Sequence, residues 1–401
     1  MPIFAFKGKN RVGNFVEGEK IGKNINEVRD RLEREQIQVI SILKKRKEME
    51  IPFLSKKKVS LRELSVFNRQ LSVMFNAGLP ITQGLGILAL EQENKYFKEV
   101  LTDIRKDVEA GSNLSDALKK HPKVFNELYT SMVEAGEASG NLDTVLIRLS
   151  NYIEESAKLV GRVKSALAYP IFVLAVALVL TYVIMIKVVP VFQRLFSQLN
   201  ATLPLPTRIV IGISQFLASN ILLILAGLGL AIFGLVSYNK TYRGRRVLDK
   251  IKLKTPIFGT LLLKLAVARV TRTLSTLLEA GVEIVNALTI TAKTSGNAIV
   301  SDAILRSRNS IQEGKLLGDS LREEGVFPFM VTQMISVGEE TGALTTMLEK
   351  IADFYEEEVE HAVEALLSVM EPLMILFLGG LVGSIIVAMY LPMFSIIGKL
   401  G

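Results

Sequence analysis

The sequence predicts an all-α membrane protein, with two tandem six-helix-type bundles, three transmembrane helices and a small α+β module at the N-terminus. Long uncharged apolar runs, helical periodicity between them and a repeat of the whole unit predict this fold class. The 401 residues are 49% hydrophobic and 22% charged. That balance is too apolar for a typical soluble enzyme and too charged for membrane helices alone, and the length allows two or three domains.

The apolar runs are long enough to cross a membrane. Residues 165–186 are 22 consecutive uncharged positions, and a helix of this length, rising about 1.5 Å per residue, spans roughly 30 Å of hydrocarbon. Pro170 lies near the start of this run and Pro190 just beyond its end, and they recur at a second run as Pro372 and Pro392, at an offset of 202 in both cases. A membrane helix therefore occurs twice.

The helical segments that precede the two runs are also related. The recurring residues at helix ends are Ala77-Gly78 with Ala280-Gly281, and Gly136, Glu137 and Gly140 with Gly338, Glu339 and Gly342. Glycine at such positions tolerates the left-handed conformation that ends a helix. We expect a break across each Gly-Glu-x2-Gly element. The unit is too long for a solenoid repeat, so the pattern indicates a tandem duplication of a bundle with its membrane helix.

This duplication has a topological consequence. Both copies enter their membrane helices from the same side, so a further span must return the chain between them. The uncharged run between Arg208 and Lys240 supplies that span. It is followed by the basic residues Lys240, Arg243, Arg245, Arg246, Lys250, Lys252 and Lys254. The positive-inside rule then predicts cytoplasmic bundles, a cytoplasmic N-terminus and an extracytoplasmic C-terminus.

We therefore expect a small α+β module (1–45), a basic linker (46–58), a first cytoplasmic bundle (59–168), a first transmembrane helix (169–189), an extracytoplasmic loop (190–208), a second transmembrane helix (209–238), a basic cytoplasmic linker (239–263), a second cytoplasmic bundle (264–371), a third transmembrane helix (372–394) and an extracytoplasmic C-terminus (395–401). Within the N-terminal module, residues 3–6 and 13–18 suit a hairpin, 26–34 a helix and 38–43 a strand. The net charge of +8 fits basic residues flanking membrane spans rather than a nucleic-acid surface.

The sequence shows no constellation for catalysis or for holding a cofactor or metal. It has no nucleophile elbow, no His-Glu-x2-His, no zinc-ligand spacing and no cysteine. We expect a protein that is not an enzyme. Glu137 and Glu339 keep two interpretations, namely acidic residues at the start of the long helix that follows, or a contact or divalent-ion role retained in both copies.

The centres of the three predicted spans carry no charge, which argues against an ion or substrate pathway through the chain. A transporter or channel is nevertheless the alternative from another class, because an oligomer could still enclose a pore. Gly379 and Gly383 form a Gly-x3-Gly pair in the last span, and such pairs suit close helix packing.

The residues at the first span resemble a known family. Residues 162–170 (RVKSALAYP), continuing to Val188-Val189-Pro190, are similar to the signature of the type II secretion F / type IV pilus platform family. The two Gly-Glu-x2-Gly elements and the two Ala-Gly helix ends fit the same resemblance, which covers essentially the whole chain. The second copy departs from it at Met370-Glu371-Pro372, where the first has Ala168-Tyr169-Pro170.

The resemblance implies a non-catalytic inner-membrane platform protein of a type IV pilus assembly machine, with a type II secretion or competence-pseudopilus platform as the alternative. Such a platform couples a cytoplasmic hexameric ATPase to the extraction of pilins into a growing fibre. The implied partners are that assembly ATPase, with a retraction ATPase as an open possibility, pilins or pseudopilins, inner-membrane alignment proteins and the lipid bilayer. The resemblance also implies a homo-oligomer, with a dimer favoured, and no nucleic acid.

Two groups of residues are candidates for these contacts. Basic residues on the first helix of each copy are candidates for the ATPase contact, with solvated helix-surface cations as the alternative interpretation: Arg62, Arg69, Arg269 and Arg272. Tyr169, Pro170 and Pro372 are candidates for the pilin contact. A proline inside a continuing helix leaves a kink and a freed carbonyl.

Overall fold

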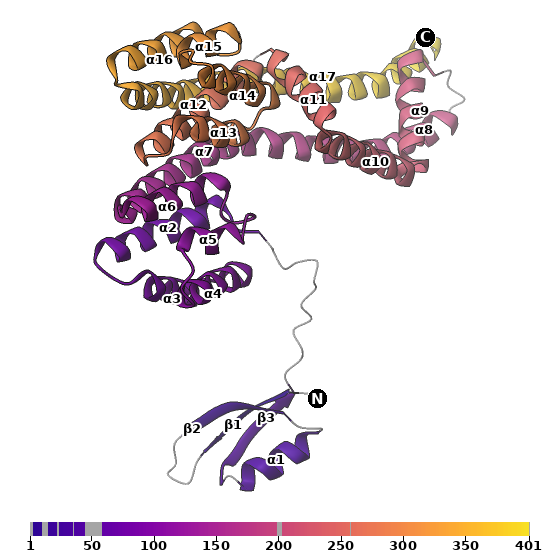
Figure 1. Ribbon diagram of the computed structural model, residues 1–401. Helices are drawn as coiled ribbons and strands as arrows, with labels where there is room; N and C mark the ends of the chain where they lie inside the picture. Colours follow the sequence, from indigo (N-terminus) through magenta and orange to yellow (C-terminus); the bar gives the residue numbers. More distant parts are fainter. Residues whose placement is uncertain are drawn as a thin grey trace. The chain divides into compact units, whose positions relative to one another are not determined.

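A computed structural model describes residues 3–9, 15–21, 24–34, 36–44, 58–198, 203–256 and 258–400 (Figure 1). The chain forms two compact units, residues 1–57 and 58–401. The fold class predicted from the sequence is confirmed: a small α+β module, tandem helical bundles and three helices long and apolar enough to cross a membrane.

The N-terminal module is a three-stranded antiparallel sheet with one helix. Strands β1 (Ile3–Lys9), β2 (Phe15–Ile21) and β3 (Gln38–Lys44) lie in the order β2-β1-β3. Helix α1 (Ile25–Arg34) contributes Val28 and Leu32 to a core that also buries Phe4 and Phe6. The expected basic linker falls outside the described residues over 46–57.

The first bundle contains α2 (Leu61–Asn76), α3 (Ile81–Glu91), α4 (Lys95–Glu109), α5 (Leu114–Lys119), α6 (Glu127–Ser139) and the bundle part of α7 (Leu142–Val183). A capping box starts α2, because the Ser60 hydroxyl accepts from the backbone N–H of Glu63, whose carboxylate accepts from the N–H of Ser60. The core of the first bundle is centred on three mutually packed rings, those of Phe67, Phe97 and Phe125.

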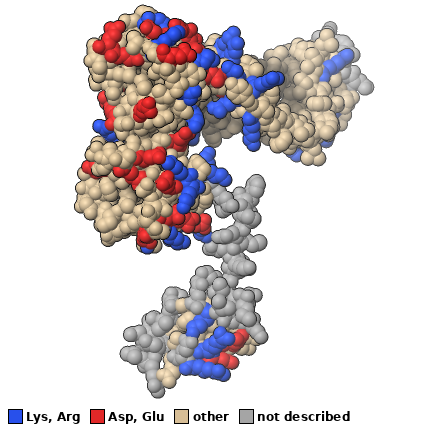
Figure 2. Space-filling model, viewed as in Figure 1, with Lys and Arg blue, Asp and Glu red and all other residues tan. Residues whose placement is uncertain are grey.

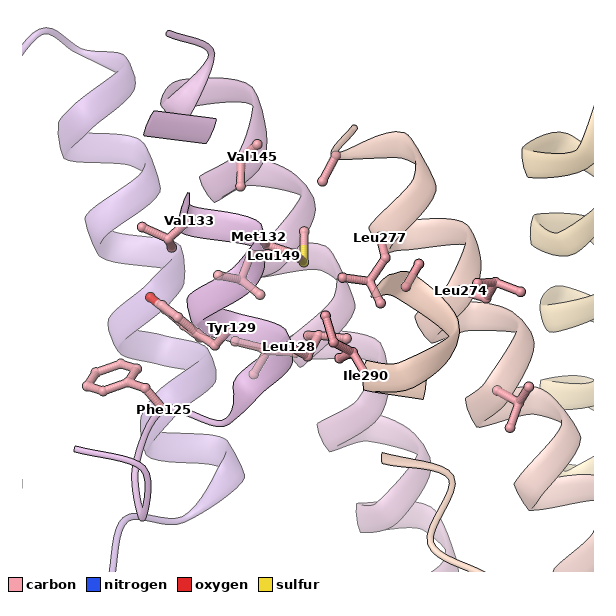
Figure 3. Packing of buried hydrophobic residues seen from close by; sticks show 14 of the residues in the cluster. Phe125, Leu128, Tyr129, Met132, Val133, Val145, Leu149, Leu274, Leu277 and Ile290 are labelled. Atoms are coloured by element: carbon pink, nitrogen blue, oxygen red, sulfur yellow. The ribbon is translucent and has the colours of Figure 1, made fainter. Parts of the chain in front are cut away.

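The second bundle repeats this order of helices. It contains α12 (Phe258–Glu279), α13 (Ile284–Thr294), α14 (Ala298–Gln312), α15 (Leu317–Glu323), α16 (Phe329–Thr341) and the start of α17 (Leu344–Leu400). The buried apolar residues of both bundles form one continuous cluster. The bundles therefore share a core, in which α6 and α7 of the first pack against α12 and α13 of the second (Figure 3).

The first membrane helix does not end at Pro190. A π-helical turn, η1 (Ile184–Val188), joins α7 to α8 (Val189–Gln198), so the chain is helical from Leu142 to Gln198. The predicted loop over 190–208 is thus wrong for most of its length. The widened π turn, in which the N–H of Val189 reaches the carbonyl of Ile184, leaves room for a proline ring that an α-helix would exclude.

The predicted second span, 209–238, is divided in two. Helix α9 (Leu205–Ser219) ends where Asn220 leaves the helical conformation, and α10 (Ile221–Lys240) follows. The hydroxyl of Ser214 on α9 donates to the carbonyl of Met185, and that of Thr207 donates to the carbonyl of Ala388. Helix α9 therefore links the first membrane helix to the third, which apolarity alone does not reveal.

The basic segment 239–263, expected as a linker, is also mostly helical. It contains α11 (Tyr242–Lys254) and the first turn of α12. Asp249 on α11 is buried and accepts from the N–H of Ala298 at the start of α14, and Arg246 forms an ion pair with Asp302. These contacts hold α11 against the second bundle. Helix α17 likewise continues past the expected end of the third span at residue 394.

Candidate functional site

Each Gly-Glu-x2-Gly element closes a helix with its last glycine. Helix α6 runs through Gly136 and Glu137 to Ser139, and Gly140 then adopts a left-handed conformation with φ of 72°. Gly342 does the same after α16, with φ of 71°. The expected break across the whole element is therefore wrong, because only the final glycine leaves the helix.

The glutamate of this element caps a different helix from the one we expected. The two carboxylate oxygens of Glu137 accept from the backbone N–H groups of Leu114 at 2.6 Å and Ser115 at 3.1 Å. Those N–H groups start α5, which ends 18 residues before Glu137 in the chain. Glu137 therefore does lie at a helix N-terminus, as one of the two interpretations expected, but the helix is α5 and not the long helix α7.

Glu339 repeats this arrangement in the second bundle. Its oxygens accept from the N–H groups of Leu317 at 2.7 Å and Gly318 at 2.8 Å, at the start of α15. Both oxygens of each glutamate are thus engaged by backbone donors. The part of the chain that the structure describes also contains no group of three or more His, Cys, Asp or Glu side chains suited to a metal ion.

The first glycine of the element allows two helices to meet closely. A Cβ on Gly136 would lie 3.1 Å from the Cβ of Val145 on α7, and one on Gly338 would lie 2.9 Å from the Cα of Leu344 on α17. The element therefore fastens three helices together in each bundle: the capped short helix, the helix that carries the motif, and the long helix that leads to the membrane.

The Ala-Gly pairs end the first helix of each bundle. Gly78 and Gly281 are left-handed, with φ of 84° and 83°. The N–H of Leu79 reaches the carbonyl of Met74, and that of Val282 reaches the carbonyl of Leu277, which are the long hydrogen bonds of a Schellman motif. Ala77 and Ala280 lie at these turns, so this repeated signal concerns helix geometry.

The four arginines proposed for an ATPase contact lie in unlike surroundings. Arg62 and Arg69 are exposed on α2, and neither forms an ion pair with another described residue. Arg269 on α12 is half-buried, with its guanidinium beside Gly296. Only Arg62 and Arg69 are fully open to a partner.

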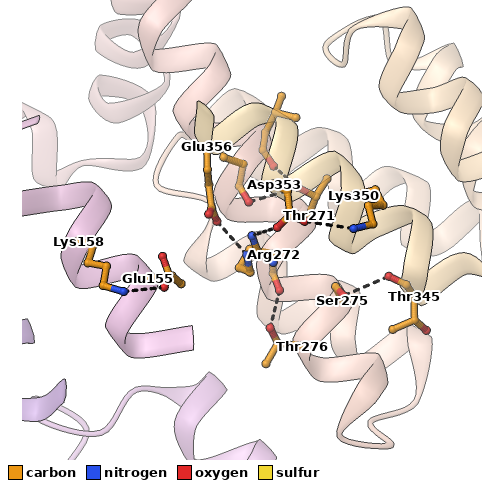
Figure 4. Close-up of polar contacts among 12 residues, drawn as sticks. Glu155, Lys158, Thr271, Arg272, Ser275, Thr276, Thr345, Lys350, Asp353 and Glu356 are labelled. Atoms are coloured by element: carbon orange, nitrogen blue, oxygen red, sulfur yellow. Dashed lines mark hydrogen bonds and ion pairs between the residues drawn. The ribbon is translucent and has the colours of Figure 1, made fainter. Parts of the chain in front are cut away.

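Arg272 is used inside the chain. Its guanidinium donates to Glu356 at 2.8 Å and to Asp353 at 2.6 Å, both on α17 (Figure 4). Burial lowers the pKa of Arg272, but these two carboxylates outweigh burial and raise it above its ordinary value. Arg272 therefore joins α12 to α17. Arg69 lacks this network: Asn151 stands in the first copy where Asp353 stands in the second, 202 residues later, and Glu154, the counterpart of Glu356, pairs with Lys158.

Two of the candidate pilin-contact residues lie together where the long helices enter the apolar region. Tyr169 and Pro170 on α7 line a cavity of about 220 Å³ with Ser368 and Glu371 on α17. Pro170 is buried, whereas Tyr169 is exposed. Pro372 is exposed and does not line this cavity. The two helices continue through both prolines without interruption.

The membrane helices also line an open apolar cavity that the sequence did not suggest. About 620 Å³ in volume, it lies between α7 with η1, α9 and α17, and residues such as Tyr182, Ile213 and Leu381 line it. Close packing was expected at Gly379 and Gly383, but a Cβ built at either position would have no atom of another described residue within 4 Å, apart from its chain neighbours and the backbone of its own helix. Figure 2 shows few charged side chains on the arm formed by these helices and basic residues where it joins the bundles.

These features define a class of protein: a membrane protein with tandem helical bundles whose long helices continue into the bilayer. The chain matches the family described as type II secretion system protein F over residues 67–190 and 270–392. It belongs to this family, and its three apolar helices make it an inner-membrane protein. The two matched ranges coincide with the duplicated unit.

Individual relatives are similar over nearly their whole length. The chain is 43% identical to the type IV pilus assembly protein PilC of Myxococcus xanthus, covering 99% of this chain and 95% of the relative. It is 42% identical to PilC of Thermus thermophilus, covering 100% and 99%. Against the type II secretion system protein F of Xanthomonas campestris it is 32% identical, covering all of both chains.

The capping role of the two glutamates gives a direct prediction. Glu137→Gln and Glu339→Gln should each lower the free energy of unfolding by about 1–2 kcal/mol, because the charge and one strong acceptor at the helix start are lost. Hydrogen exchange at residues 114–115 and 317–318 should increase in the corresponding variant. Exposed Glu340, next to Glu339, provides the control, and Glu340→Gln should change stability by less than about 0.5 kcal/mol. Stabilisation by Ca²⁺ that the Gln variants lose would instead support an ion site.

Proposed function

We propose that the chain is the non-catalytic platform of a type IV pilus assembly machine, which passes motion from a cytoplasmic hexameric ATPase to pilins in the bilayer. The observation that carries the proposal is that α7 and α17 each run unbroken from a bundle into a membrane span. Because an α-helix is a stiff rod at this length, displacement of a bundle moves the membrane end of the same helix.

Contacts between the two long helices support this proposal. Leu159, Val163 and Leu167 of α7 pack with Val359, Val363 and Leu366 of α17 just before both helices enter the apolar region. Arg162 of α7 also pairs with Glu360 of α17. Motion applied to one bundle would therefore reach both spans.

The relatives favour a pilus over secretion. The PilC proteins of two bacteria are 43% and 42% identical to this chain, whereas the secretion protein F of Xanthomonas campestris is 32% identical. A type II secretion or competence-pseudopilus platform is the second candidate within the family. Expression in strains lacking their own platform distinguishes the two, since only the matching machine regains surface fibres or secretion of its substrate.

A transporter or channel is the rival from another class. The membrane cavity described above has no charged residue among those that line it, which disfavours an ion pathway there. Substrate-specific flux through the purified protein in liposomes would favour the rival.

The proposed orientation places both bundles and the N-terminus in the cytoplasm and the C-terminus outside, because α11 carries six basic residues at the inner end of α10. Single cysteines at exposed Ser112 and Lys315, one in each bundle, should then resist a membrane-impermeant maleimide in intact spheroplasts. Cysteine at exposed Ser197 in α8 should react under the same conditions. Labelling of either bundle before lysis would refute this orientation.

Arg62 and Arg69 are the two candidate arginines that are exposed in the single chain. Reversing both charges to Glu should reduce co-purification of the assembly ATPase by about tenfold and abolish piliation. The reason is that two carboxylates would then repel the acidic surface of the ATPase that the arginines are proposed to bind. Lys98→Glu on the exposed surface of α4 is the control and should retain binding. Unchanged ATPase binding in the double variant would remove these arginines from the proposal.

The pilin contact is proposed at Tyr169, Pro170 and Pro372. Since the chain has no cysteine, a single Tyr169→Cys should crosslink to a cysteine placed in the apolar segment of the pilin. Leu223→Cys on α10 is equally exposed to the bilayer and should give little adduct. Equal adducts from the two positions would indicate random collision in the membrane and contradict a contact at Tyr169.

A further inference from the structure

The two bundles of one chain meet through unlike faces. The first bundle contributes α6 and α7, and the second contributes α12 and α13. Because α12 and α13 are the repeat counterparts of α2 and α3, the contact joins the last two helices of one copy to the first two helices of the next. In such a head-to-tail contact each bundle uses only one of its two contact faces, so the other face of each bundle stays uncovered.

Each chain therefore keeps one unused face of each kind. The first bundle leaves α2 and α3 without a bundle on them, and the second leaves α16 and α17. Figure 1 shows α3 and α16 at opposite ends of the pair of bundles. Both faces carry large exposed apolar residues, including Leu90, 75% exposed on α3, and Phe329, 71% exposed on α16.

Each residue of the internal contact has a counterpart at the equivalent position of the repeat on one of the unused faces. Inside the chain, Lys293 of α13 donates to Glu127 of α6 at 2.7 Å. The counterpart of Lys293 is Leu90, at an offset of 203, and that of Glu127 is Phe329, at 202. An ion pair in one contact thus corresponds to two exposed apolar side chains at its unused equivalents, and these two suit each other as partners.

Neighbouring positions repeat this relation. Ile290 on α13 and Leu128 on α6 are buried within the internal contact (Figure 3). Their counterparts, Ile87 on α3 and Met330 on α16, are partly exposed. Apolar residues are therefore exposed at positions whose counterparts are covered by the other bundle inside the chain.

We propose that a second copy of this chain occupies these faces, with α16 and α17 of one chain packing on α2 and α3 of the next in the way that α6 and α7 pack on α12 and α13. Leu90 of one chain then contacts Phe329 of its neighbour. This surface is a homo-oligomer interface and does not depend on the proposed role in pilus assembly.

The membrane geometry is compatible with repeating this contact. Helices α7 and α17 pack side by side where they approach the apolar region, so the contact between the two bundles is compatible with both spans lying in one bilayer. A contact of the same kind between chains would place the spans of neighbouring chains side by side as well.

A charge exchange tests the contact. Phe329→Glu and Leu90→Lys should each lower the association constant by about tenfold or more in native mass spectrometry from nanodiscs, because each buries a charge against an apolar side chain of the neighbour. The double variant should regain association, since it rebuilds between chains the pair that Glu127 and Lys293 form within one. Leu316→Lys, at an exposed leucine before α15, is the control and should associate as the unaltered protein does. Circular dichroism of all four verifies folding.

Crosslinking distinguishes head-to-tail packing from a symmetric pair. A mixture of chains with Leu90→Cys and chains with Phe329→Cys should form intermolecular disulfides, whereas either variant alone should not. The inference is overturned if the unaltered protein is monomeric in membranes, if the double variant stays dissociated, or if Leu90→Cys chains crosslink to one another.

Discussion

Parallel packing of α7 and α17 where they enter the membrane is the constraint on which the rest of the structure depends. Apolar residues of both helices meet there, and Arg162 pairs with Glu360. Since each helix is continuous with its own bundle, the position of one bundle limits that of the other. The shared core between the bundles and the cross-links made by α9 between the two spans then act on a single framework.

The duplicated unit keeps its local geometry and changes its surfaces. Glu137 and Glu339 cap the same short helix in each copy, and the neighbouring glycines allow the same close approach. These features are required wherever the unit folds, because they satisfy backbone donors and remove a clash. Surface pairs differ between the copies: Arg272 is bound to two carboxylates, whereas its counterpart Arg69 is free of ion pairs among the described residues. Arg69 of the first bundle is therefore an exposed cation, whereas Arg272 of the second bundle links α12 to α17.

The internal contact also explains why exposed apolar residues are unevenly placed. A head-to-tail repeat buries one face of each copy and leaves the equivalent faces at its two ends. Leu90 and Phe329 lie on those end faces, whereas their counterparts Lys293 and Glu127 bind each other inside the chain. Gly379 and Gly383 in the third span also have open space around them, which leaves room for a helix from outside this chain.

The sequence by itself determined the repeat, the three apolar spans and the turns at Gly78 and Gly281 that end the first helix of each bundle. These depend on local properties: the length of an uncharged run, the period of apolar residues and the conformations that glycine permits. The partners of polar groups were decided only by the tertiary structure, since Glu137 reaches an N-terminus 23 residues away and Arg272 reaches carboxylates more than 80 residues away. The separation of α9 from α10 and the helix beyond Pro190 were also decided there. An uncharged apolar run looks the same in the sequence whether it forms one long span or two separate helices such as α9 and α10. Only contacts with neighbouring helices distinguish these two cases.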